Sequence, residues 1–121
     1  MKNKLTLGIL AAALAAEVIV AIPTPAAAQS EATILADVEY KKADKELNEI
    51  YQKIIKRVQP SSKQDLIESQ RAWLTFRNLD AKVRAGISSQ GGSSYSTDYI
   101  AILTDLTNQR IASLKSMLIA L

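Results

Sequence analysis

Apolar side chains recur along this chain at helical spacing, in segments that are separated by glycine, proline and serine. The first segment, residues 31–58, has no glycine or proline and is rich in alanine, glutamate, lysine and leucine, which favour helices. Steps of three and four residues separate the positions that share one face, and this period predicts a helix. Those positions are Tyr40, Asp44, Leu47, Tyr51, Ile54 and Val58, with Ile50 and Ile55 beside them. We expect Pro60 to end this helix, because proline lacks the backbone donor and clashes with the preceding turn.

A second segment with the same period follows. A helix is predicted over residues 63–85, after Ser61 and Gln64, which have the spacing of a capping box. In that arrangement the Ser61 hydroxyl and the Gln64 amide would satisfy backbone donors at the helix start. The core-facing positions of this helix are Leu66, Gln70, Trp73, Arg77 and Ala81, flanked by Ile67 and Leu74.

A third helix is predicted to begin at Ser96 or Thr97 as N-cap, with Asp98 in the first turn, where negative charge suits the helix dipole. Its core-facing positions are Tyr99, Leu103, Leu106, Arg110, Leu114, Met117 and Leu121. No stretch alternates at period two for long enough to predict a strand. The predicted fold class is therefore all-α, a three-helix up-down bundle made of a long helical hairpin and a third helix.

The second and third predicted helices are joined by a polar stretch, GISSQGGSSYST, at residues 86–97. Its glycines free the backbone and its serines compete for backbone hydrogen bonds, so we expect a flexible loop. Polar loops can enter concave sites, which makes this one the candidate partner-binding segment. The residues expected to contact a partner are Gly91, Gly92, Ser93 and Tyr95. The alternative is that the loop only connects two helices.

Each predicted helix also places polar side chains on or beside its apolar face. These are Asp44 and Asn48, then Gln70 and Arg77, then Arg110. A buried guanidinium needs a carboxylate or carbonyl close by, because leaving it unpaired is strongly destabilising. Asp44 and Asp80 are the available anions. Two interpretations stay open: a buried network that fixes how the helices pack, or side chains at the bundle margin whose charged ends reach water.

The first 28 residues have the layout of a secretory signal peptide. A basic start, MKNK, precedes the apolar run LTLGILAAALAA, and Ala26 and Ala28 then form an A-x-A pattern. Cleavage is expected between Ala28 and Gln29, which leaves residues 29–121 as a single domain. An uncleaved membrane anchor is disfavoured by Glu17 and by the two prolines that follow the apolar run. We expect no stable membrane anchor after cleavage and a periplasmic or secreted location in the bacterial cell envelope.

Charge and composition exclude several classes of function. The net charge of +3 falls to +2 when Lys2, Lys4 and Glu17 are removed with the signal peptide, which is too weak to favour nucleic acid as a partner. The chain has no cysteine and no histidine, so it lacks disulfides, the usual general base, the strongest nucleophile and most metal ligands. No glycine-rich phosphate-binding motif is visible. The protein is predicted to be non-enzymatic, with no cofactor and no metal site.

Three fragments of the chain carry a distinctive set of residues. They are YKKADKELNEIYQKI at residues 40–54, QRAWLTFRN at residues 70–78 and LTNQRIASL at residues 106–114. In this order and spacing they resemble the family of exported domains that is named for the mycobacterial lysozyme inhibitor LprI. The family motifs read A-D-x-x-L-N-x-x-Y, Q-x-x-W-x-x-[FY]-R and L-T-x-x-R-x-x-x-L. The matching residues are Ala43, Asp44, Leu47, Asn48, Tyr51, Gln70, Trp73, Phe76, Arg77, Leu106, Thr107, Arg110 and Leu114.

The resemblance implies a small envelope or secreted protein that inhibits a lysozyme-type muramidase or binds near the cell wall. Family members commonly carry cysteines near the positions of Ala81 and Ile102, and here we expect an apolar contact in place of that bridge. Common lysozymes are strongly basic, so a slightly basic inhibitor would need locally segregated charge. The alternative function is a structural or interaction module, which acts through helix–helix self-association or through another envelope protein.

Overall fold

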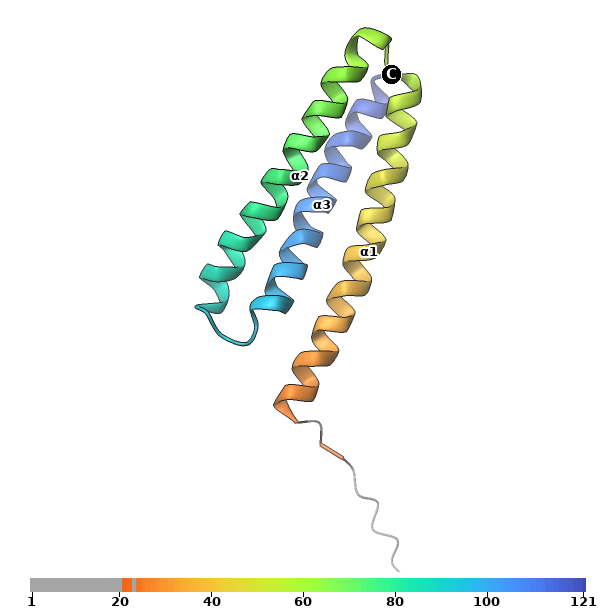
Figure 1. Cartoon of the computed structure of the whole chain (residues 1–121). Helices are drawn as coiled ribbons and strands as arrows, with labels where there is room; N and C mark the ends of the chain where they lie inside the picture. The colour runs from red at the N-terminus through yellow and green to blue at the C-terminus, as the bar shows by residue number, and fades with distance from the viewer. Residues whose placement is uncertain (1–20, 23) are drawn as a thin grey trace, which may run out of the picture.

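The computed structural model describes residues 21–22 and 24–121 of the chain. These residues form three helices, α1 (Pro25–Arg57), α2 (Pro60–Ser89) and α3 (Tyr95–Ile119), and the described part contains no strand (Figure 1). The all-α three-helix prediction is therefore confirmed. Most of the predicted signal peptide lies outside the described residues and stays a prediction. Helix α1 begins at Pro25, so the predicted cleavage point after Ala28 lies near its N-terminus.

Helix α3 packs along both other helices and lies between them in the view of Figure 1. Helices α1 and α2 are joined by the short link at residues 58–59, and elsewhere their backbones stay apart. This arrangement determines where the polar side chains meet.

The start of α2 differs from the prediction. Pro60 does not simply stop the first helix, because it occupies the first position of α2, where its missing N–H would have no helical partner in any case. Gln59, in extended conformation, is the N-cap residue and makes no side-chain capping bond. The predicted capping box of Ser61 and Gln64 is therefore wrong, and the Gln64 amide instead donates a hydrogen bond of 2.9 Å to Glu68.

The link between α2 and α3 is shorter than predicted. It spans only residues 90–94, because α2 continues to Ser89 and α3 already begins at Tyr95, with Ser94 as its N-cap position. Two of the serines that were expected to favour a loop lie instead at helix ends, Ser88 in the last turn of α2 and Ser94 just before α3. The hydroxyls of Ser88 and Ser94 both donate hydrogen bonds to the carboxylate of Asp98, at 2.9 and 3.1 Å. Asp98 thus ties the end of α2 to the start of α3.

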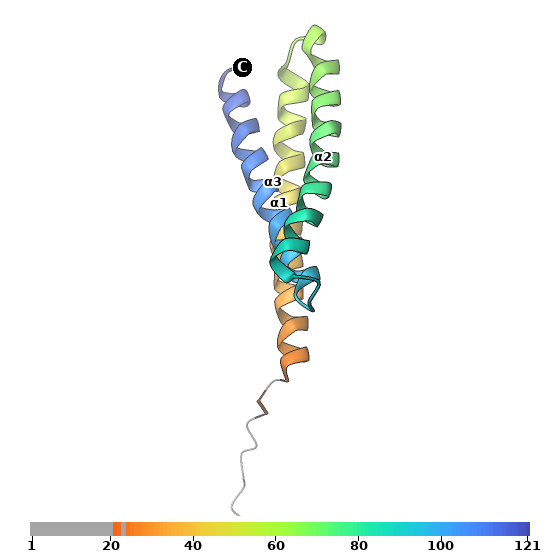
Figure 2. The same cartoon turned by 90° about the vertical axis from the view of Figure 1, so that its left-hand side faces the viewer.

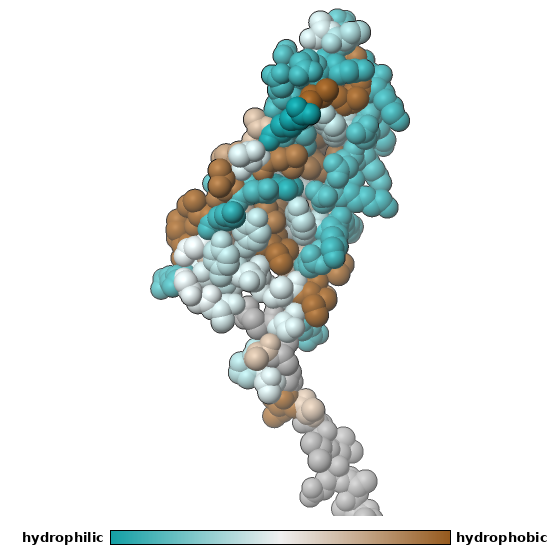
Figure 3. All heavy atoms as spheres, viewed as in Figure 1, coloured by the Kyte–Doolittle hydropathy of each residue, from teal (hydrophilic) through white to brown (hydrophobic). Residues whose placement is uncertain are grey.

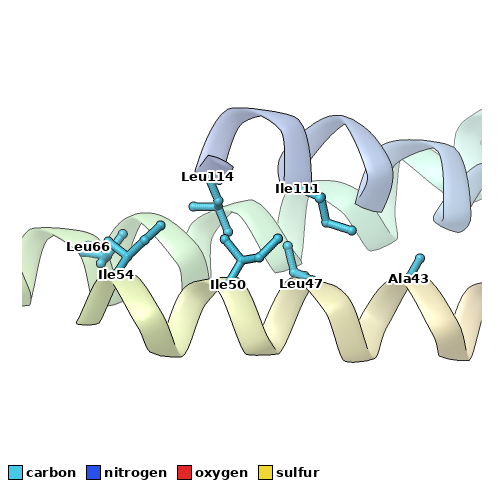
Figure 4. Close-up of a cluster of buried hydrophobic side chains, with 7 residues drawn as sticks. All are labelled: Ala43, Leu47, Ile50, Ile54, Leu66, Ile111 and Leu114. Atoms are coloured by element: carbon cyan, nitrogen blue, oxygen red, sulfur yellow. The ribbon is translucent and has the colours of Figure 1, made fainter. Parts of the chain in front are cut away.

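The main hydrophobic core forms where all three helices meet (Figure 4). Its buried side chains are Ala43, Leu47, Ile50, Ile54, Leu66, Ile111 and Leu114. A second, smaller cluster contains Ala81, Leu103 and Leu106, with Tyr40, Tyr99 and Ile102 packed against it. Ala81 and Ile102 therefore belong to one apolar cluster, as expected for an apolar contact in place of a bridge.

The last turns of α3 diverge from the bundle (Figure 2). Met117 and Leu121, which the helical period predicts to face the core, are exposed. A pocket of about 330 Å³ opens beside them, between the end of α1, the start of α2 and the end of α3. The helical period identifies the apolar face of a helix, but it does not show along how much of its length a neighbouring helix covers that face.

Candidate functional site

Arg77 is the buried charge at the centre of the bundle, with only 5% of its surface exposed. It extends from α2 and donates hydrogen bonds from Nη1 to Thr107 Oγ1 on α3, at 3.3 Å, and from Nε to Asn78 Oδ1, at 3.1 Å. Nη1 also lies 3.7 Å from Asp44 Oδ1 on α1. One guanidinium therefore connects all three helices, which supports the buried-network interpretation for Arg77.

Aromatic rings enclose this guanidinium. Its central carbon lies 5.2 Å from the centre of the Trp73 ring and 5.6 Å from that of Tyr40. Cations in this position are attracted to the ring faces, and the attraction is stronger where water is excluded. Burial raises the pKa of Tyr40 above its usual value, and the charge of Arg77 opposes that rise. The contact of Tyr40 was not predicted, although it lies one helical turn before Asp44 on the same face.

Arg110 of α3 makes a second, more exposed junction with α2. Its Nε donates to Gln70 Oε1 at 3.0 Å, its Nη2 donates to Ser69 Oγ at 3.3 Å, and its guanidinium lies 5.8 Å from the Trp73 ring centre. Gln70 is 7% exposed, so its amide oxygen needs this partner. Burial lowers the pKa of Arg110, but a guanidinium remains charged under ordinary conditions.

Three residues of the expected polar core lie elsewhere. Asn48 is exposed and only donates a 3.4 Å hydrogen bond to Asp44. Asp80 forms its ion pair with Arg84, at 2.7 Å within α2, and not with Arg77. Tyr51 packs against the main hydrophobic core. For Asn48 the margin interpretation holds, because this position turns away from both neighbouring helices.

The candidate partner-binding residues lie at the end of the bundle where α2 meets α3. Gly91, Gly92 and Ser93 are exposed in the short link, whereas Tyr95 belongs to the first turn of α3 and stacks on Tyr99, with 6.2 Å between ring centres. Gly91 has a positive φ of 76°, and a Cβ at Gly92 would lie 2.9 Å from the Ser89 carbonyl oxygen. The tight turn itself therefore explains both glycines.

The geometry of the polar cluster is suited to holding helices together. The donors of Arg77 and Arg110 are directed at side chains of the protein itself. Among the described residues, no group of three or more histidine, cysteine, aspartate or glutamate side chains could hold a metal ion. Within the same part of the chain, no helix is both long enough and apolar enough to cross a bilayer.

A family model and a protein of another organism match this chain. The family model described as "Lysozyme inhibitor LprI" matches residues 23–114, a range that includes the whole polar cluster. The chain is also 30% identical over 106 residues to a protein of Rhizobium meliloti (strain 1021) named "Uncharacterized protein R02472", and the match covers 77% of this chain and 76% of that protein. No solved structure matches the chain.

Proposed function

The chain belongs to the lysozyme inhibitor LprI family, and from this premise we propose that it is an exported, non-enzymatic envelope protein that inhibits a lysozyme-type muramidase. The observation that carries the proposal is the family match over residues 23–114. The chemistry of the chain is compatible with it, because a protein without histidine or cysteine can inhibit by occupying a surface and needs no reactive group.

The polar cluster supports such a role indirectly. A binding surface keeps its affinity when the scaffold beneath it is rigid, since less ordering is needed on association. Arg77 links the three helices, and Arg110 adds a second link between α2 and α3. In this proposal the family motif residues maintain the shape of the protein, and the contact with the muramidase is made by exposed residues.

The proposal predicts that the protein slows the lysis of peptidoglycan. The full chain would be expressed in a bacterial host, and the purified product titrated into muramidases of several classes while the turbidity of a peptidoglycan suspension is followed. We expect a dose-dependent slowing with at least one muramidase. The control is an equal molar amount of an unrelated small helical bundle. Unchanged lysis by every class at high molar excess would reject the proposed function.

A second candidate function is an interaction module that associates with copies of itself. The observation that favours it is a row of exposed apolar side chains on the outer face of α2. The row consists of Phe76, Leu79, Val83 and Ile87, at spacings of three and four residues. Burial of this row against a second copy predicts a dimer at micromolar concentration in sedimentation experiments, and a strict monomer would contradict this function.

A further inference from the structure

We infer that the N-terminal part of α1 is the surface that contacts the muramidase, through a face on which exposed acidic and apolar side chains lie together. We call it the α1 acidic–apolar face. It consists of Glu31, Ile34, Leu35, Val38 and Glu39. This inference rests on the proposed function and adds to it the contact surface and the chemical nature of the partner, a basic protein.

The apolar part of this face is accessible. Ile34 and Leu35 are each 61% exposed and Val38 is 54% exposed, which is unusual for three large apolar side chains within five residues. The opposite side of the same turns faces α3. There the hydroxyl oxygens of Thr33 and Thr97 are 2.6 Å apart in a hydrogen bond, and Tyr40 packs on the smaller core cluster. The α1 acidic–apolar face therefore points away from the bundle.

The first turns of α1 also project from the molecule. Thr33 lies against Thr97 in the first turn of α3, so the turns of α1 before Thr33 have no α3 beside them. Both views of the fold show α1 continuing past the link between α2 and α3 (Figures 1 and 2). Glu31 belongs to these projecting turns, and the other residues of the face follow directly where α3 begins. The α1 acidic–apolar face therefore lies at the open end of the bundle, where a concave surface such as a sugar-binding cleft can approach it.

The charge on this segment is opposite to that of the rest of the protein. Residues 29–40 carry three acidic side chains and no basic one, whereas residues 41–121 carry 13 basic and eight acidic side chains. Within the described residues, no ion pair involves Glu31 or Glu39, while Asp37 is paired with Lys41 at 2.6 Å. This segment can therefore attract a basic partner, although the chain as a whole is slightly basic.

Other exposed surfaces fit a basic partner less well. In Figure 3 the edge of the molecule formed by α1 is hydrophilic along its upper part and becomes apolar toward the N-terminus. Lys42, Lys45 and Lys53 lie close together on α1, with Lys115 of α3 and two glutamates beside them. The excess of positive charge there would repel a basic protein. The apolar row on α2 has Lys82 and Arg84 beside it. The α1 acidic–apolar face instead combines exposed apolar area with two glutamates that, among the described residues, form no ion pair.

An apolar centre with a charged rim is the usual anatomy of a protein interface. Ile34, Leu35 and Val38 would supply the buried area. Glu31 and Glu39 would accelerate association with a positively charged partner and make it sensitive to salt. Common lysozymes are basic, so the chemistry of this face matches the partner that the proposed function requires.

Two paired variants test the inference by separating charge from apolar area. Glu31→Lys with Glu39→Lys reverses the charge of the rim, and Ile34→Ser with Val38→Ser removes apolar area. All four side chains are exposed, so the melting temperature of each variant should remain near that of the unchanged protein. In the lysis assay, each pair should raise the concentration needed for half-inhibition by about tenfold or more. The charge-reversed protein should also lose most of the salt dependence.

Matched controls lie on α2. Glu68→Lys reverses an exposed charge there, and Val83→Ser with Ile87→Ser removes exposed apolar area. These controls should inhibit as the unchanged protein does. Full inhibition by both α1 variants, or equal losses in the α2 controls, would overturn the inference and leave the proposed function standing. Absence of inhibition by the unchanged protein would instead reject the proposed function, and this inference with it.

Discussion

Arg77→Met should lower the free energy of unfolding by about 2 kcal/mol, because it removes a buried charged group that connects all three helices. Methionine preserves much of the apolar volume but cannot donate to Thr107 or attract the rings of Trp73 and Tyr40. A fully buried charge left without its partner would cost about 3–5 kcal/mol. Here Asp44 would lose its partner, but 40% of its side chain is exposed and water can solvate it, so we expect a smaller loss.

Thermal melting of the variant measures this effect. In a domain of this size, 1 kcal/mol corresponds to about 4–8 °C, so the melting temperature should fall by about 10 °C or more. Arg110→Met is the matched control, since this guanidinium is only half-buried and spans two helices, and its loss should be about 1 kcal/mol. Equal melting of Arg77→Met and the unchanged protein would mean that the guanidinium does not fasten the helices.

Leu114→Ala should have the largest effect, a loss of about 3 kcal/mol in the free energy of unfolding. Leu114 is 0% exposed and contributes to the main core where α3 meets α1 and α2 (Figure 4). Truncation removes apolar contacts and leaves a cavity that backbone movement closes only in part. Because α3 is the one helix that packs along both others, damage to its buried face affects both interfaces at once.

Urea unfolding followed by circular dichroism measures this loss. The control is Ile119→Ala, also in α3, at a position that is 87% exposed, where we expect a change within about 0.5 kcal/mol. The slope of the unfolding free energy against urea should be the same for both variants, since the surface exposed on unfolding hardly changes. A loss below about 1 kcal/mol for Leu114→Ala would show that the core collapses around the smaller side chain.

The boundaries of the helices show why local signals were insufficient. Pro60 was correctly identified as the point where the first helix cannot continue, but the same residue is also suited to begin a helix. The stretch at residues 86–97 contains serines that favour a loop when considered alone. Ser88 and Ser94 instead bond to Asp98, and this contact depends on two helices lying side by side. Whether a proline or serine ends a helix therefore depends on tertiary contacts, which a sequence pattern does not show.

The polar cluster was predicted in part. The positions of Gln70, Trp73 and Arg77 on one helical face were evident from their spacing, and Asp44 was named as an available anion for Arg77. Thr107 was expected only as a family motif residue, and Tyr40 only as part of an apolar face, yet both contact Arg77. Asp80 was an equal alternative to Asp44, but in the structure it pairs with Arg84, one turn further along α2.

The sequence alone determined that the chain forms three amphipathic helices, that it has no disulfides or histidine chemistry, and that it resembles one family. These properties follow from composition and from the spacing of residues within a helix, which are local. Only the tertiary structure decided that α3 packs along both α1 and α2, and that Arg77 of α2 meets Asp44 of α1. It also decided that Ile34, Leu35 and Val38 remain uncovered. Which helix faces meet depends on packing between residues that are far apart in the chain, and a local period carries no information about them.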